Sequence, residues 1–484
     1  MALRTFMGGI RPRDGKELSR DKAIRLVLPD KELVYPLAQH DGLAPLPCVA
    51  VGDKVLVGQK IADVKEPAPK DTASAADTLS CVPLHASVSG KVTAIGKRDL
   101  AGHMSECILI ENDGLYDEIE YPVPLPLAEM DNAAIIARIR DGGVVGMSGG
   151  AFPTHIKLGI PNPEKIAFII INAIECELYY TTDHRLLLEE AQRLIEGIHV
   201  LLKLFPYARG IIAIADNKPD AIALLKSMTA KEQRIGVREL QSKFPQGEER
   251  QLILSTTGRM LDAGSDLSDA GCMVINVETV VAICRSVVEG KNIISRVVTV
   301  SGDAICAPQC FSVRFGTAFD TLIKEAGGFV GDKPPAKILR GGPMSGQVMT
   351  DTSLPVTKMD AALICLGRDD VANAAPLSCI NCGKCAEVCF KRLQPAKLAV
   401  FAEHGDEAAF YRFKGDECCG CGCCSYICPA KRYLSQTIVA LLLEKLKPQH
   451  DNTEDTENTD NTENPENTEN TENTENTENT ENTA

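Results

Sequence analysis

The sequence predicts a multidomain α/β protein whose last folded domain is helical and rich in cysteine. Two observations lead to this prediction. Helical and buried β patterns alternate between residues 128 and 290, which is the rhythm of a three-layer α/β domain. Two cysteine runs of the same spacing follow near the C-terminus. A chain of 484 residues has room for several domains, and we expect them at 1–125, 128–290, 295–350, 360–447 and 450–484.

Residues 1–125 are expected to form short strands joined by turns. The segments 48–55 and 85–92 carry alternating apolar residues and glycine turns, which indicates a small β-sandwich. They are similar to the two halves of a lipoyl-type barrel-sandwich module. Lys91 does not lie in a lipoyl or biotin attachment context. We therefore interpret this module as a docking or packing unit rather than a swinging arm.

The next two modules combine helices and strands. Between 128 and 290 we expect the elements to follow the apolar pattern of each segment, with helices at 133–141 and 184–204 and buried strands at 165–171 and 210–215. Between 295 and 350 the pattern indicates strands near 297–300 and Val313 and a helix at 318–326, as in a small β-grasp module. Helical spacing at 395–413 and 434–446 predicts a helical domain around the cysteines.

The cysteine runs are the most specific signal in the chain. Each has the spacing C-x2-C-x2-C-x3-C, which is the ligand pattern of a protein that holds two [4Fe-4S] clusters. The runs are Cys379, Cys382, Cys385 and Cys389, and Cys418, Cys421, Cys424 and Cys428. Zinc is the alternative, but zinc sites usually pair their cysteines two and two. We therefore predict a carrier of single electrons.

In two-cluster ferredoxins the fourth cysteine of each run binds the other cluster. One cluster would then take Cys379, Cys382, Cys385 and Cys428, and the other Cys418, Cys421, Cys424 and Cys389. Two features depart from the usual pattern. The first run ends in Cys-Phe instead of Cys-Pro, and Cys419 and Cys423 blur the register of the second run.

Composition excludes several functional classes. Asp451 to the C-terminus contributes twelve carboxylates and no Lys or Arg, so the formal charge of −15 falls to −3 without this Asn-Thr-Glu repeat. We expect the tail to be disordered. No basic stripe predicts nucleic-acid binding. No apolar run reaches the roughly 18 residues of a membrane span, and no secretory signal begins the chain. The other cysteines then indicate a reducing, cytoplasmic compartment.

A glycine-rich loop at 146–154 (GMSGGAFPT) is the main candidate for a phosphate site. Glycines allow backbone N–H groups to approach a phosphate, and Lys157 could add a counter-charge. The alternative is an ordinary tight turn. The loop does not match the dinucleotide-binding pattern G-x-G-x-x-G after a strand.

These segments resemble two related families. The loop with Lys157, the segment 172–177 (NAIECE), the segment 247–249 (GEE) and the segment 276–279 (NVET) resemble the NADH- and FMN-binding subunit of respiratory complex I. The N-terminal module and the second cysteine run favour one of the two families. Together with the segments 6–12, 39–42, 216–219 and 341–346, they resemble the RnfC family of the Rnf ion-translocating electron transport complex.

The resemblance implies FMN, NAD(H) and two [4Fe-4S] clusters in a peripheral subunit on the cytoplasmic face of the inner membrane. It implies NADH and the other subunits of the complex as partners. The residues that it places near flavin or nucleotide are Gly146, Gly149, Gly150, Phe152, Lys157, Asn172, Glu175, Glu177, Glu248, Glu249 and Asn276. Ser148 and Ala151 stand where glycines are usual, Gly150 where alanine is usual, and Leu178 where proline is usual.

Several of these residues also have a purely structural interpretation. Phe152 could belong to the core, the glutamates of 172–177 could form the acidic first turn of a helix, and Asn276 could cap a helix. No side chain is required as a general base, because the hydride chemistry belongs to the cofactor.

Three functions are compatible with these features. The first is an NADH/ferredoxin oxidoreductase subunit of an ion-translocating Rnf complex. The second is a separate flavo-iron–sulfur reductase for another acceptor, such as proline reductase or a corrinoid enzyme. The third is an electron-wire or docking subunit without nucleotide binding. The N-terminal module favours the first over a corrinoid reductase.

Overall fold

The structure is a computed structural model that describes residues 4–64, 80–262, 264–331, 334–369, 371 and 373–446. The predicted disordered tail at 450–484 lies outside the described residues. The part of the chain up to Leu442 contains all the sheets and both cysteine runs.

The N-terminal module is a barrel sandwich of two antiparallel sheets, as predicted. A four-stranded sheet has the order β2-β8-β7-β4, and a three-stranded sheet has the order β3-β5-β6. The long β7–β8 hairpin turns at Ala101 and Gly102, both with positive φ, which matches the right-handed twist of the strands. The bounds are β2 Glu32–Pro36, β3 Leu46–Pro47, β4 Lys54–Val55, β5 Lys60–Asp63, β6 Leu84–His85, β7 Gly90–Leu100 and β8 His103–Asn112.

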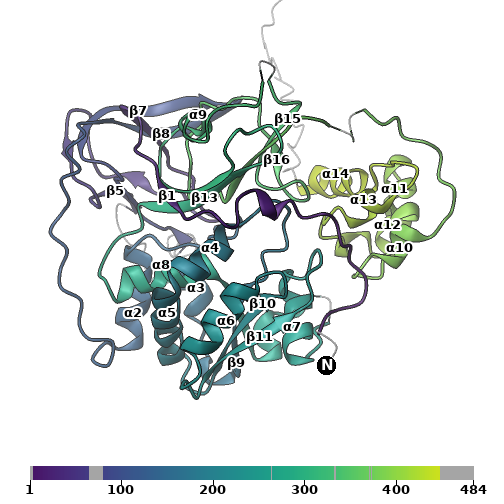
Figure 1. The fold of residues 1–484 in the computed structure, drawn as a ribbon, viewed down its shortest axis with the longest axis horizontal. Helices are drawn as coiled ribbons and strands as arrows, with labels where there is room; N and C mark the ends of the chain where they lie inside the picture. Colours follow the sequence, from purple (N-terminus) through teal and green to yellow (C-terminus); the bar gives the residue numbers. More distant parts are fainter. Residues whose placement is uncertain are drawn as a thin grey trace, which may run out of the picture. The chain divides into compact units, whose positions relative to one another are not determined.

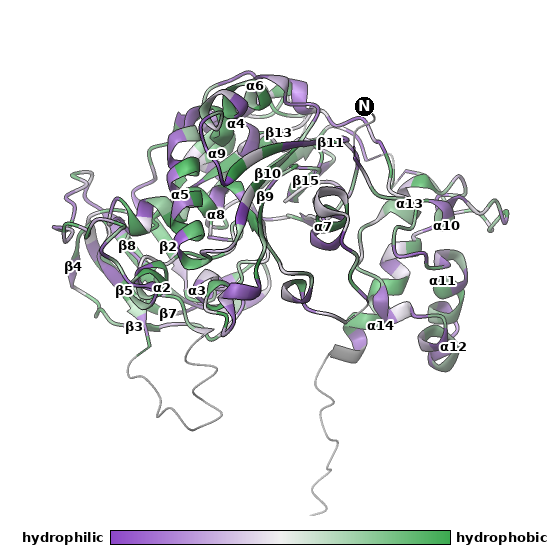
Figure 2. Ribbon diagram, turned by 90° about the horizontal axis from the view of Figure 1, so that it is seen from below, coloured by the Kyte–Doolittle hydropathy of each residue, from purple (hydrophilic) through white to green (hydrophobic). Residues whose placement is uncertain are grey.

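The second module is a three-layer α/β domain around a parallel sheet of order β11-β10-β9-β12 (Figure 1). Its central strands are apolar along most of their length (Figure 2), as expected for strands buried on both faces. Ile169 and Ile171 of β9 pack with α5 and α8, whereas Ile170 packs with α7. The strands are β9 Phe168–Ala173, β10 Arg209–Ala215, β11 Ile235–Leu240 and β12 Cys272–Asn276.

Both helices predicted for this domain, at 133–141 and 184–204, are present, with one difference. The expected helix at 184–204 is two helices, because the backbone leaves helical geometry at Glu190, where φ is −119° and ψ is 23°. The helices are α2 Asn132–Asp141, α3 Thr154–Leu158, α4 Thr182–Glu189, α5 Ala191–Leu204, α6 Pro219–Met228, α7 Glu249–Thr257 and α8 Val277–Val287.

A six-stranded mixed sheet follows, with the order β1-β14-β13-β17-β15-β16. The predicted strands and helix near 295–326 are present, and α9 covers the sheet. The sheet also takes β1 from near the N-terminus and β17 from beyond residue 350, so it extends outside the predicted range of 295–350. The elements are β1 Arg25–Leu26, β13 Ser295–Ser301, β14 Gln309–Arg314, α9 Phe319–Glu325, β15 Lys337–Arg340, β16 Gln347–Val348 and β17 Ala362–Leu366.

The cysteine-bearing region is helical. Two short helices each follow a glycine with positive φ, Gly383 before α10 and Gly422 before α13, so the two cysteine runs repeat one local structure. The predicted helical stretch at 395–413 divides at Gly405, whose φ is +66°. The helices are α10 Lys384–Glu387, α11 Pro395–Glu403, α12 Glu407–Arg412, α13 Cys423–Ile427 and α14 Leu434–Leu446.

Candidate functional site

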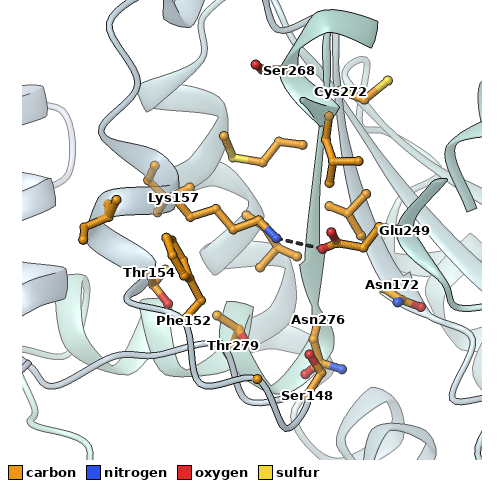
Figure 3. Close-up of a pocket in the computed structure, with 18 of the residues that line it drawn as sticks. Ser148, Phe152, Thr154, Lys157, Asn172, Glu249, Ser268, Cys272, Asn276 and Thr279 are labelled. Atoms are coloured by element: carbon orange, nitrogen blue, oxygen red, sulfur yellow. Dashed lines mark hydrogen bonds and ion pairs between the residues drawn. The ribbon is translucent and has the colours of Figure 1, made fainter. Parts of the chain in front are cut away.

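The main candidate site is a cavity of about 660 Å³ in the α/β domain. It lies between the glycine-rich loop, the full length of β12, Asn172 near the carboxyl end of β9, and the start of α7 (Figure 3). Ligands of open parallel sheets bind at the carboxyl ends of strands, and cofactor pockets have volumes of this order. Seven of the predicted cofactor residues line the cavity, namely Gly146, Gly150, Phe152, Lys157, Asn172, Glu249 and Asn276.

The glycine-rich loop is a turn closed by backbone hydrogen bonds, with empty space beside two of its glycines. Gly146 N donates to Phe152 O at 2.9 Å, and Ala151 N donates to Gly146 O at 3.1 Å. Gly149, with φ +109°, does not line the cavity, and a Cβ added there or at Gly150 would meet no atom within 4 Å. Ala151 adopts φ +44°, a left-handed conformation that favours glycine. An alanine thus stands in a conformation that the glycine of the family pattern would adopt more easily.

Lys157 and Glu249 form an ion pair at the wall of this cavity. Lys157 Nζ lies 2.8 Å from Glu249 Oε1, and both side chains are partly exposed (Figure 3). The lysine comes from α3 and the glutamate from the first residue of α7. A cation at this position suits an anionic group such as a phosphate, and the neighbouring carboxylate limits its free charge.

Two asparagines stand side by side at the ends of adjacent strands, with Asn172 of β9 in register with Asn276 of β12. Asn172 Nδ2 donates to Gly247 O at 2.9 Å, which ties β9 to the loop before α7. Asn276 Oδ1 accepts from Glu278 N at 2.9 Å and so caps α8. Asn276 is therefore a helix cap and also part of the cavity wall.

Glu175 does not line the cavity. Its side chain is only 2% exposed and lies 3.3 Å from Lys16 Nζ. Its second oxygen accepts from Asp183 N at 2.7 Å, at the start of α4. These contacts give Glu175 a structural role.

Glu177 and Glu248 also lie outside the cavity lining. Glu177 accepts from Met344 N at 2.9 Å and from Ser345 Oγ at 2.7 Å, and burial raises the pKa of its carboxyl above the ordinary value. It therefore holds the loop at 341–346 against the α/β domain. Glu248 caps α7 by accepting from Gln251 N at 2.9 Å.

A buried ion pair that the sequence patterns did not reveal supports the loop from behind. Arg296 Nη2 lies 2.7 Å from Glu278 Oε2 and also 2.7 Å from Met147 O, and both side chains are almost fully buried. Met147 N in turn donates to Thr279 Oγ1 at 2.9 Å. No motif marks Arg296, which is an ordinary residue of β13. Ser148, Thr154, Asp266, Ser268 and Thr279 are polar lining residues that were also not predicted.

The cysteine runs form two further cavities. The first has a volume of about 210 Å³ and is lined by Cys379, Cys382, Cys385 and Cys428. The second is narrower, about 20 Å³, and is lined by Cys389, Cys418, Cys421 and Cys424, together with the additional thiols Cys419 and Cys423. Both predicted crossed sets are thus brought together, with the fourth cysteine of each run beside the other run.

Each donor set consists of four cysteine thiols around one cavity. Within the described residues, no group of three or more His, Cys, Asp or Glu side chains is already arranged to hold a metal ion. Four soft sulfur ligands around a cavity are the chemistry of an iron–sulfur cube.

The chain combines an FMN-type α/β domain, a barrel sandwich and a cysteine-rich helical region. This combination defines the class of protein: a flavoprotein related to the nucleotide-binding subunit of complex I. Residues 139–285 match the Nuo51 FMN-binding domain, and residues 4–115 match the RnfC barrel sandwich hybrid domain. The chain belongs to the RnfC family, whose members are subunits of the Rnf ion-translocating oxidoreductase complexes.

Curated relatives cover most of the chain. The RnfC-type member of the Na⁺-translocating ferredoxin:NAD⁺ oxidoreductase complex of Acetobacterium woodii is 37% identical over 82% of this chain and 87% of the relative. Its counterpart in the proton-translocating complex of Clostridium ljungdahlii is 35% identical over 83% of this chain and 85% of the relative. A solved NAD⁺-reducing [NiFe]-hydrogenase shares 20% identity with a TM-score of 0.45 over 57% of this chain and 53% of its own.

Proposed function

We propose that this chain is the NAD(H)- and FMN-binding subunit of a membrane-bound, ion-translocating ferredoxin:NAD oxidoreductase. It would pass electrons between NAD(H), FMN and two [4Fe-4S] clusters to partner subunits, which couple the flow to ion transport. The observation that carries this proposal is the combination, in one chain, of the 660 Å³ cavity in the FMN-type domain and the two four-cysteine cavities. The relatives named above are subunits of complexes with this activity.

The residues divide the work by their chemistry. FMN, when bound, supplies the conversion between hydride transfer and single-electron transfer. Lys157 and Gly150, which line the cavity, would hold its phosphate, because they offer a cation and unobstructed backbone. Asn172 and Asn276 would orient the ring system with their amides. Phe152, which is 44% exposed, would cover the ligand with an aromatic face.

The two cysteine sets differ in access, which suggests their order. Cys379 and Cys382 of the first set are exposed, whereas no member of the second set is exposed: Cys424 is buried, and Cys389, Cys418 and Cys421 are partly buried. The second run also packs against residues of the α/β domain, including Phe244 and Cys176. Electrons from the flavin would therefore enter the second-run cluster and reach partner subunits through the first-run cluster.

The location is also part of the proposal. Within the described residues, no helix combines the length and the apolar character needed to cross a bilayer. A peripheral position on the cytoplasmic face, held by the other subunits of the complex, is compatible with this finding.

The test is anaerobic purification of the full chain with reconstituted FMN and clusters, followed by addition of NADH. We expect flavin absorbance to bleach first and iron–sulfur absorbance to bleach second. Intact clusters with FMN present and no response to NADH would contradict the proposal. Co-purification with membrane subunits would separate it from a free-standing reductase.

A further inference from the structure

The N-terminal residues 6–10, which we term the strap, cross between the flavin-type domain and the second cysteine run. The chain enters the strap from the domain's sheet, since Arg4, two residues before the strap, pairs with Leu240 at the end of β11. It then forms an antiparallel bridge between Ile10 and Phe244, with N···O distances of 2.8 and 2.9 Å. Both ends of the strap are therefore anchored to the α/β domain.

Between these anchors the strap contacts the cysteine domain. Gly9 N donates to Val388 O at 2.8 Å, one residue before Cys389. The Phe6 ring meets the Phe390 ring edge-on at 5.9 Å, one residue after it. The strap thus contacts both sequence neighbours of Cys389, which is a predicted ligand of the second-run cluster.

The strap also closes an apolar contact around the second run. Ile10, Phe244 and Cys423 are buried together, and Cys176, Met344, Val388 and Cys421 pack against them. Cys176 lies next to the wall of the candidate flavin cavity. A Cβ added at Gly247, which lines the cavity, would be 3.2 Å from the Sγ atom of Cys176. Cys176 therefore lies between the cavity wall at Gly247 and the buried cluster of Ile10, Phe244 and Cys423, against which Cys421 also packs.

Only glycine fits the crossing. Gly8 and Gly9 have φ of +85° and +74°, and a Cβ on Gly9 would lie 2.7 Å from Phe244 O. Lys243 holds the strap from the other side, since its Nζ donates to Phe6 O and Gly8 O and lies 3.9 Å from the centre of the Phe6 ring. This ammonium fixes two carbonyls and one ring of a five-residue segment.

We propose that the strap is a positioning element for electron transfer, which sets the separation between the flavin and the second-run cluster. This inference rests on the proposed function. Electron transfer depends steeply on separation, so loosening the strap slows the step from flavin to cluster. The step from NADH to flavin lies within the α/β domain and does not pass through the strap.

The experiment is stopped-flow reduction by NADH of the reconstituted full chain and of Gly9→Val. We expect the flavin phase to stay within about twofold of the unsubstituted chain and the iron–sulfur phase to slow by about tenfold or more. Gly102→Val is the matched control, because Gly102 has φ +89° and nothing within 4 Å of its added Cβ. It reproduces the backbone strain in a remote hairpin and should leave both phases unchanged.

Lys243→Gln provides a milder variant in case Gly9→Val does not fold. It removes the charge and the ring contact, and it should slow only the iron–sulfur phase. Direct reduction by dithionite reports whether the clusters are loaded. Two results for strap variants with loaded clusters would overturn the inference. In one, both phases keep the rates of the unsubstituted chain; in the other, both phases slow by the same factor. Absence of flavin bleaching in the unsubstituted chain would instead show that the proposed function itself fails.

Discussion

Lys157 and Glu249 neutralise each other across the candidate flavin cavity, with Nζ 2.8 Å from Oε1. The lysine is 33% exposed and the glutamate 44% exposed, so water screens the pair and either charge is available to a ligand. The carboxylate thereby competes with an anionic ligand for the only lysine that lines the cavity within the described residues.

The first prediction follows from this competition. Glu249→Gln should tighten FMN binding a few-fold, because Lys157 would then face the phosphate without a carboxylate partner. Lys157→Met should weaken binding by about tenfold, corresponding to ~1.4 kcal/mol. Quenching of FMN fluorescence in titrations at low and high salt measures both effects.

Riboflavin is the matched control for that experiment, since it lacks the phosphate. Neither substitution should change riboflavin binding by the amount seen with FMN. Equal effects on both ligands would place Lys157 away from the phosphate.

The second prediction concerns Arg296 and Glu278. Arg296→Met leaves a buried carboxylate without its cation and frees Met147 O, so the free energy of unfolding should fall by about 3–5 kcal/mol. The double variant Arg296→Met/Glu278→Leu should recover part of this loss. Urea denaturation of the unsubstituted chain, Arg296→Met, Glu278→Leu and the double variant measures the difference. A double variant as unstable as the two losses added together would rule out the pair as a coupled unit.

The third prediction concerns pH. Lys358 is fully buried, and its Nζ donates to Pro83 O at 3.0 Å and Gly143 O at 2.8 Å. Desolvation lowers the pKa of its ammonium from 10.5 to about 7, with a smaller opposing influence from Cys81. Between these two values the unfolded chain holds the additional proton, so stability should rise with pH above about 7 and level off near 10.5.

The slope of this rise can reach about 1.4 kcal/mol per pH unit. Urea midpoints at pH values of about 7, 8 and 9 should increase for the unsubstituted chain and much less for Lys358→Met. Lys91→Met, at an exposed position of β7, is the control and should keep the full slope. A slope that persists in Lys358→Met would assign the pH dependence to other groups.

The fourth prediction separates cluster ligands from the additional thiols. Cys421→Ser should lower the iron and acid-labile sulfide content by about half, from about eight to about four iron atoms per chain. Cys419→Ser should leave the content unchanged, although Cys419 lines the same cavity. Colorimetric iron and sulfide assays distinguish the two. Equal loss of iron and sulfide in both variants would show that a different set of cysteines in the second run binds the cluster.

Local patterns explain what the sequence predicts well. The cysteine spacing acts over a few residues, so each run could be recognised from the sequence. The crossed sets came from the rule for two-cluster ferredoxins, and the cysteines of each set line one cavity. The isoleucine-rich segment at 165–171 and the carboxyl-end position of Asn172 likewise depend on a single strand. The parallel order of the four strands then places Asn276 beside it.

Long-range relationships could not be predicted in the same way. The pairing of Lys157 with Glu249 joins residues 92 positions apart, and the contact of Arg296 with Met147 joins residues 149 positions apart. Glu175 and Glu177 occur in a family segment, but tertiary contacts occupy their carboxylates with Lys16 and the loop at 341–346. The break at Glu190 was not predicted because two helices with similar apolar patterns meet there.

The six-stranded sheet has a consequence for synthesis of the chain on the ribosome. Its strand order needs Arg25–Leu26 beside β14 and Ala362–Leu366 between β13 and β15. The first of these strands is made early and must wait for β14, and the sheet closes only after residue 366 has emerged. The nascent barrel sandwich and α/β domain, which share one hydrophobic core, can therefore pack before this sheet is complete, while β13 carries an open edge that waits for β17.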